Sequence, residues 1–244
     1  SGDLVLAGRA TQPRASRVIT SPAGMVAHGA LLLGGTFNDI PNFDPNVSRI
    51  VTEQLYLPSE PGFPTASLFP AVLGNIVRLL QTSGAVDQQL NVVPAQFIAT
   101  TTATPTIGVE RAYRRLDYAI YHAPFEDTDF IPPSIRVTTA FTSSGQVIFA
   151  VKADDTRSAE PLTPGEITRV LVLYRRLGAP GWTLLEPGYN VNNDVWFGSI
   201  PANGVIEYFA QAVDASGNVA TALDYGNPFR IVTPWIQALP IVAR

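Results

Sequence analysis

The chain has 244 residues, of which 46% are hydrophobic and 15% are charged, and this composition excludes a globally disordered polymer. Its net charge of −4 and its 16 dispersed basic residues exclude the basic surface that nucleic-acid-binding proteins present. The absence of cysteine excludes disulfides, thiolate metal sites and cysteine nucleophiles.

The sequence of residues 1–124 predicts a β-rich N-terminal domain. Leu73, Ile76, Val77 and Leu80 have helical spacing, so we expect one short helix there, with a strand as the alternative. For the whole segment we expect a β-sandwich similar to a jelly roll. Apolar runs favour strands at residues 4–7, 17–19, 25–33, 50–57, 90–100 and 109–121.

Residues 38–46 offer oxygen ligands that could bind calcium. Asp39, Asn42, Asp44 and Asn46 follow one another at spacings of 3, 2 and 2 residues. Calcium prefers carboxylate and amide oxygens clustered in a loop. Ordinary Asx turns are the alternative explanation, because Asn and Asp side chains often bond nearby backbone amides.

Residues 125–133 predict a linker between two domains. Its prolines favour extended backbone, and its acids are expected to keep it solvated. Glu126, Asp127 and Asp129 form a second candidate calcium site, where an ion would make the hinge between the domains rigid.

Residues 134–232 predict a β-sandwich domain, because short apolar runs alternate with turn residues such as Pro, Gly and Asn. The clearest element is a hairpin, in which Asp214 bonds the turn amides while Gly217 and Asn218 tolerate positive φ. The predicted strands are residues 135–141, 146–153, 167–174, 182–185, 195–200, 205–213 and 219–223.

Residues 129–230 resemble the immunoglobulin-like or fibronectin type III-like modules of bacterial secreted and surface proteins. The resemblance implies a non-catalytic extracellular sandwich whose core packs around Trp182, Trp196 and Tyr208. The motifs that carry it are Asp129-Phe-Ile-Pro-Pro-Ser-Ile135, Val170-Leu-Val-Leu-Tyr-Arg175 followed by Trp182, and Glu207-Tyr-Phe-Ala-Gln-Ala-Val-Asp-Ala-Ser-Gly-Asn218.

The sequence contains little evidence of catalytic residues. His28 and His122 are the two histidines, and neither lies in a recognisable catalytic setting or near a Gly-x-Ser-x-Gly elbow. Asp154 and Asp155 end a predicted strand, where acids commonly solvate a turn. We therefore expect that the protein is not an enzyme.

The combined expectation is an all-β protein of two tandem sandwich domains, followed by an apolar tail at residues 233–244. We expect an extracellular structural or adhesion module at the cell surface, with surface proteins, further domains or polysaccharide as partners. No run is apolar over the length of a membrane span. The alternatives are a carbohydrate-binding or spacer region of a secreted hydrolase, and a subunit of an extracellular filament or surface layer.

Overall fold

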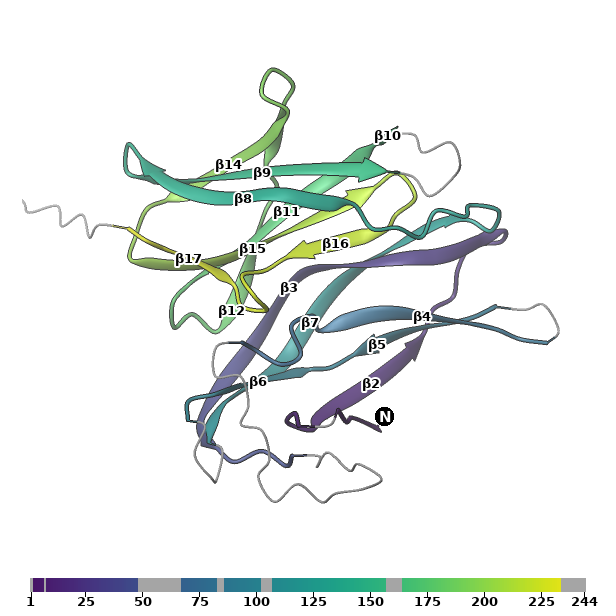
Figure 1. Ribbon diagram of the computed structural model, residues 1–244, viewed down its shortest axis with the longest axis horizontal. Coiled ribbons are helices and arrows are strands. Elements are labelled where there is room, and N and C mark those ends of the chain that lie inside the picture. Colours follow the sequence, from purple (N-terminus) through teal and green to yellow (C-terminus); the bar gives the residue numbers. More distant parts are fainter. Residues whose placement is uncertain are drawn as a thin grey trace, which may run out of the picture.

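The fold is all-β, as predicted. The computed structural model describes residues 2–6, 8–47, 67–82, 86–101, 107–156 and 164–233, and these contain strands in antiparallel sheets and no helix (Figure 1). The predicted strand at residues 50–57 and the apolar tail from residue 234 lie outside the described residues. No described helix could cross a membrane.

The described strands run in chain order as follows. They are β1 (Gly2–Leu4), β2 (Gln12–Val18), β3 (Met25–Phe43), β4 (Gly74–Leu80), β5 (Val86–Val92), β6 (Ala95–Ala99), β7 (Gly108–Pro124), β8 (Ser134–Ser143), β9 (Gln146–Thr156), β10 (Pro164–Gly165), β11 (Ile167–Arg176), β12 (Gly181–Leu185), β13 (Gly188–Asn190), β14 (Val195–Pro201), β15 (Val205–Asp214), β16 (Val219–Ala222) and β17 (Phe229–Val232).

Residues 134–232 form two facing layers, drawn in the upper part of Figure 1. One layer contains β8, β9 and β14, and the other contains β11, β15, β16 and β17. Alternate residues of β9 and β15 point into a shared apolar core, where Phe149 packs against Tyr208 with ring centroids 5.0 Å apart. All seven strands predicted for this region are confirmed, while the short strands β10, β13 and β17 were missed.

The hairpin of β15 and β16 has the predicted bonding of Asp214 and the positive φ at Gly217, whereas Asn218 does not have a positive φ. The Asp214 carboxylate accepts a hydrogen bond from the Asn218 backbone N–H at 2.8 Å and another from the Asn218 side-chain amide at 2.9 Å. Gly217 adopts a φ of 81°, which a residue with a Cβ rarely tolerates.

An eight-stranded sheet continues from this region into the N-terminal region. In β12 and β3, Gly181 pairs with Thr36 and Trp182 pairs with Gly35. A Cβ on Gly181 would lie 2.8 Å from the Gly35 carbonyl oxygen, so the close approach of the two strands requires glycine at position 181. Beyond β3, the sheet adds β7 and β6.

The expected helix is wrong, because residues 74–80 form strand β4. β4 pairs with β5 from Gly74↔Val92 to Leu80↔Val86. The β-branched Ile76 and Val77 suit a strand, and this ladder satisfies the backbone hydrogen bonds that a helix would otherwise provide. β4 and β5 lie in a smaller sheet of order β1-β2-β5-β4.

The two predicted domains pack against each other. The outer face of β11 and β15 contributes Leu173 and Phe209 to a cluster that also contains Leu32 and Phe37 of β3. Trp182 lies in this shared cluster and meets Phe209 edge-on at 4.9 Å. The division at residues 125–133 stays a prediction, although the described parts on either side share a sheet and a core cluster.

Residues 125–133 were expected to form a solvated linker, but part of this junction segment is buried. Asp129 is buried. The ring of Phe130 lies 4.7 Å from the ring of His28, and the Arg78 guanidinium carbon lies 4.0 Å from the centre of the Phe130 ring. The segment therefore packs on strands β3 and β4.

Candidate functional site

The first predicted calcium site does not form a loop. Asp39 and Asn42 lie in β3, and Asp44 and Asn46 follow its end with exposed side chains. The Asp39 carboxylate accepts two hydrogen bonds from the Arg111 guanidinium, at 2.8 and 3.1 Å. Its oxygens are thus bonded to a cation that belongs to the protein.

The structure separates the three acids of the predicted junction site. Glu126 is exposed, and Asp127 accepts a hydrogen bond from the Asp129 backbone N–H at 2.9 Å, which forms an Asx turn. Asp129 alone turns into the protein, where its carboxylate accepts a hydrogen bond from the Ile131 backbone N–H at 3.3 Å.

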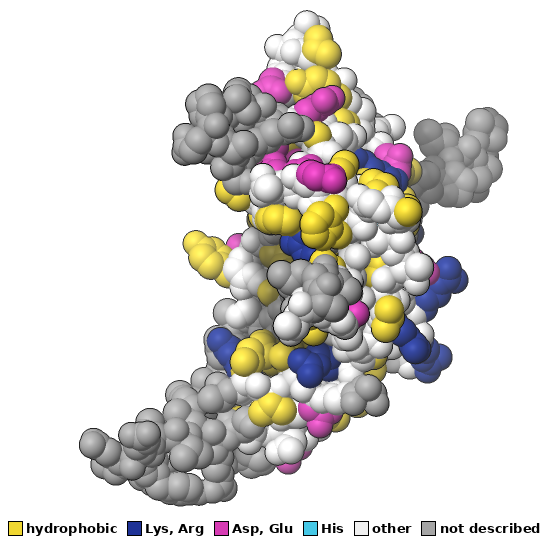
Figure 2. All heavy atoms as spheres, turned by 90° about the vertical axis from the view of Figure 1, so that its right-hand side faces the viewer, with side chains coloured by type: hydrophobic (Ala, Val, Ile, Leu, Met, Phe, Trp, Pro, Cys, Tyr) yellow, Lys and Arg dark blue, Asp and Glu magenta, His cyan; other side chains and the backbone are white. Residues whose placement is uncertain are grey.

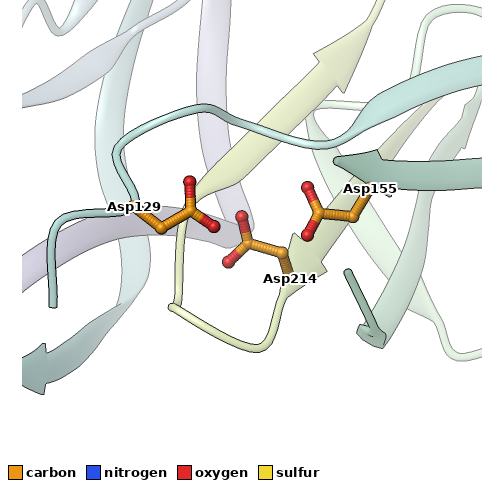
Figure 3. Close-up of side chains that lie close together, drawn as sticks. All are labelled: Asp129, Asp155 and Asp214. Atoms are coloured by element: carbon orange, nitrogen blue, oxygen red, sulfur yellow. The ribbon is translucent and has the colours of Figure 1, made fainter. Parts of the chain in front are cut away.

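Asp129 meets two acids that the sequence analysis assigned to turns. Figure 3 shows Asp129 of the junction, Asp155 of β9 and Asp214 of β15 pointing toward one another. One oxygen from each carboxylate lies within 4.8 Å of the others. Their exposed fractions are 5%, 6% and 1%, respectively. Among the described residues, this is the group of acids and histidines that could hold a metal ion.

Burial and mutual repulsion shape the chemistry of this carboxylate trio. Burial raises the pKa of Asp214, and the nearby charge of Asp129 raises this pKa further, while the hydrogen bonds from Asn218 oppose both effects. Three ionised carboxylates at this separation inside a protein require a compensating positive charge. Such a charge can come from a proton, from a cationic side chain, or from a hard cation such as calcium, for which carboxylate oxygens are suitable ligands.

His28 lies on the neighbouring strand β3 and is also buried. Neither ring nitrogen has a hydrogen-bond partner within the described residues. Burial, and then the charge of Arg78, lower the pKa of His28 despite the nearby carboxylates. The ring is therefore neutral at neutral pH and packs as an apolar group against Phe130.

A second group of charges lies at the boundary between the two regions, in a buried ion-pair network. Glu207 of β15 pairs with Arg175 of β11 at 2.5 Å and with Arg230 of β17 at 2.7 Å. The Arg175 guanidinium carbon lies 4.8 Å from the centre of the Phe37 ring, and that of Arg111 lies 4.4 Å from it. This network connects β3 and β7 with β11, β15 and β17.

A polar cleft of about 380 Å³ lies beside this ion-pair network. Residues of both regions line it, and ligand sites commonly form at such boundaries. We name it the junction cleft, and its lining residues are Leu68, Ile98, Arg111, Glu207, Asp224, Asn227, Pro228 and Arg230. The sequence showed no signal for it, since these residues are spread along the chain from Leu68 to Arg230.

Charged side chains are unevenly distributed over the surface. On the face in Figure 2, acidic side chains gather toward the upper end, and most basic ones lie lower. This agrees with the sequence, in which most of the acidic residues follow residue 125. The surface has no single strongly charged patch on this face.

No protein-family model, no curated protein and no solved structure matches the chain.

Proposed function

We propose that the protein is a non-catalytic structural or adhesion module of the cell exterior, with an immunoglobulin-like sandwich at residues 134–232. The observation that carries this proposal is the backbone pairing of β12 with β3, which joins the two regions in one sheet. A paired sheet with a shared core holds a fixed shape and leaves its loops available for contacts.

The resemblance to secreted modules supports the extracellular location. In this proposal the partners are other surface proteins, further domains or polysaccharide. Loops are the segments that such modules commonly use for contacts, while paired strands hold the shape.

A second candidate is the carbohydrate-binding or spacer region of a secreted hydrolase. The junction cleft favours this candidate, because its acid, amide and guanidinium groups suit the hydroxyl groups of a sugar. The two candidates differ in what is attached to the module and share the absence of catalysis.

Antibodies raised against the purified protein test the proposal on intact cells of the organism that encodes it. We expect labelling without permeabilisation, and loss of the label after protease treatment of whole cells. Deletion of the gene should reduce attachment of the cells to surfaces or to one another. Labelling that requires permeabilised cells would overturn the proposal.

A further inference from the structure

The turn that precedes β17 holds a tyrosine in an unfavourable backbone conformation. Asp224 and Asn227 exchange two backbone hydrogen bonds, at 2.7 and 2.9 Å. Between them, Tyr225 has a φ of 48° and Gly226 a φ of 88°, as in a type I′ turn. Asn or Gly suits the first central position, whereas a bulky side chain there is strained.

The tyrosine side chain makes little contact that could offset this strain. Its exposed fraction is 92%, the largest given for any hydrophobic side chain in the described part of the chain. The other described non-glycine residues with positive φ are Asn42, Ser144 and Asp194, which are small and polar. A strained residue that the surrounding fold does not need points to a role in binding.

The same turn forms one wall of the junction cleft. Asp224 and Asn227, which flank Tyr225 and Gly226, both line this cleft. Asn227 accepts a hydrogen bond from the Leu68 backbone N–H at 3.0 Å, which fixes the turn against the N-terminal region. Tyr225 therefore lies in a turn whose two flanking residues line the cleft, and the cleft volume of about 380 Å³ is in the range of small-molecule sites.

The charges in and behind the junction cleft are held in place and balance one another. The Asp39 carboxylate bonds Arg111 at two positions, and the Glu207 carboxylate bonds both Arg175 and Arg230. With Asp224, which also lines the cleft, the three guanidinium groups are matched in number by three carboxylates. The cleft is thus polar and rigid without a net charge that would select an ionic ligand.

We propose that the junction cleft binds a neutral saccharide, with Tyr225 stacking on one face of a sugar ring. Planar carboxylate, amide and guanidinium groups form pairs of hydrogen bonds with adjacent hydroxyl groups. A tyrosine ring offers an apolar face to the C–H groups of the sugar and a polar edge to water. This inference deepens the adhesion proposal, on which it rests, by assigning the ligand class.

A glycan array tests the inference with the purified protein. The array carries neutral hexose oligosaccharides beside sialylated and sulfated glycans. We expect binding to neutral members, and at least a tenfold loss of affinity in Tyr225→Asn, measured by titration calorimetry with the neutral oligosaccharide that binds. Binding to no glycan, or to anionic glycans alone, would overturn the inference.

Tyr225→Asn also separates lost binding from lost folding. Asn is favoured in the left-handed conformation, so this variant should melt about 2–4 °C higher than the wild type. Weaker binding in a more stable protein assigns the loss to the missing ring. Unchanged affinity in this variant would overturn the role of Tyr225.

Tyr189→Ala is the matched control, since Tyr189 is also exposed but lies on β13, away from the cleft lining. We expect its affinity to equal that of the wild type, and an equal loss in both variants would overturn the site. Failure on the array together with surface labelling of intact cells would refute the ligand and leave the proposed function standing. Glycan binding without surface labelling would support the ligand and refute the proposed function.

Discussion

The two regions differ in the size of the apolar clusters that are their own. Between the layers of residues 134–232, a single cluster of buried apolar side chains surrounds Phe149 and Tyr208. In the N-terminal region, the cluster around Phe97 is small. Other apolar residues of this region, such as Leu31 and Phe37, pack in clusters that it shares with residues 134–232. Both regions also bury polar side chains, which are Gln12, His28, Gln88, Gln96, Glu110 and Arg111 in the N-terminal region, and Asp155, Arg175, Glu207, Gln211, Asp214, Ser216, Asn218 and Thr233 in residues 134–233.

Apolar clusters and hydrogen-bonded polar side chains are two ways to fill the space beside a sheet. An apolar core gains free energy from area removed from water and depends little on pH. A polar interior depends on paired groups, as where Gln96 accepts a hydrogen bond from the Tyr113 hydroxyl at 2.9 Å and donates one to the Pro70 carbonyl at 2.7 Å. Both regions bury titratable groups, so the stability of each should depend on pH where such a group changes its charge.

Two phenylalanine truncations compare the apolar clusters directly. We expect Phe149→Ala to lower the free energy of unfolding by about 5 kcal/mol and Phe97→Ala to lower it by about 3 kcal/mol, because fewer buried apolar groups surround Phe97. Urea denaturation measures both. Equal losses would show that the two clusters stabilise the protein equally.

Glu207→Gln tests the ion-pair network at the boundary of the regions. The Arg175 side chain is 2% exposed, so this variant leaves a buried positive charge uncompensated. We expect a loss of about 3 kcal/mol in the free energy of unfolding. Asp117→Asn is the control, because its partner Arg115 is exposed and the loss should stay below about 0.5 kcal/mol.

Glu110→Gln tests the polar interior of the N-terminal region. Burial raises the pKa of Glu110 to about 7, while the bond from the Gln12 amide opposes the rise. The folded protein therefore holds this proton more tightly than the unfolded chain does, and stability falls as pH rises from about 4.5 through 7.

Gln removes that titration and still offers a donor to the Gln12 side-chain oxygen, which has no partner within the described residues. At pH 8 we expect Glu110→Gln to be more stable than the wild type by about 1–2 kcal/mol, since nearby solvent screens part of the charge. At pH 4 the two proteins should melt together. A loss of stability at both pH values would contradict this expectation.

Asp129→Asn gives the smallest expected effect and addresses the carboxylate trio. In a chelating buffer at pH 7, one fewer charge should raise the free energy of unfolding by about 0.5–1 kcal/mol. The pKa of Asp214 lies above its unfolded value, so stability is lost as pH rises through the folded pKa, and the variant should weaken this dependence.

The same variant tests the calcium expectation. If calcium binds the trio, saturating calcium raises the melting temperature of the wild type, and Asp129→Asn loses that increase because a ligand is missing. Unchanged melting of the wild type in saturating calcium would exclude a calcium site.

Several elements could be predicted from local patterns. The Asp214–Asn218 turn and the alternation in β9 depend on neighbouring residues, and the structure contains both. The helical spacing from Leu73 to Leu80 led to the wrong prediction of a helix, because backbone pairing with β5 outweighs a short apolar pattern. The candidate calcium residues were chosen by their spacing within one segment, so they included Asp129 but not Asp155 and Asp214, which the fold brings beside it.

By itself, the sequence determined the β class and most strand positions in residues 134–232, because turn preferences and alternating apolar residues act over a few positions. Only the tertiary structure decided that β3 continues the sheet of β12, that three distant aspartates converge, and that Tyr225 stands beside a cleft. These features depend on contacts between segments far apart in the chain, where local preferences carry no information about which partners meet.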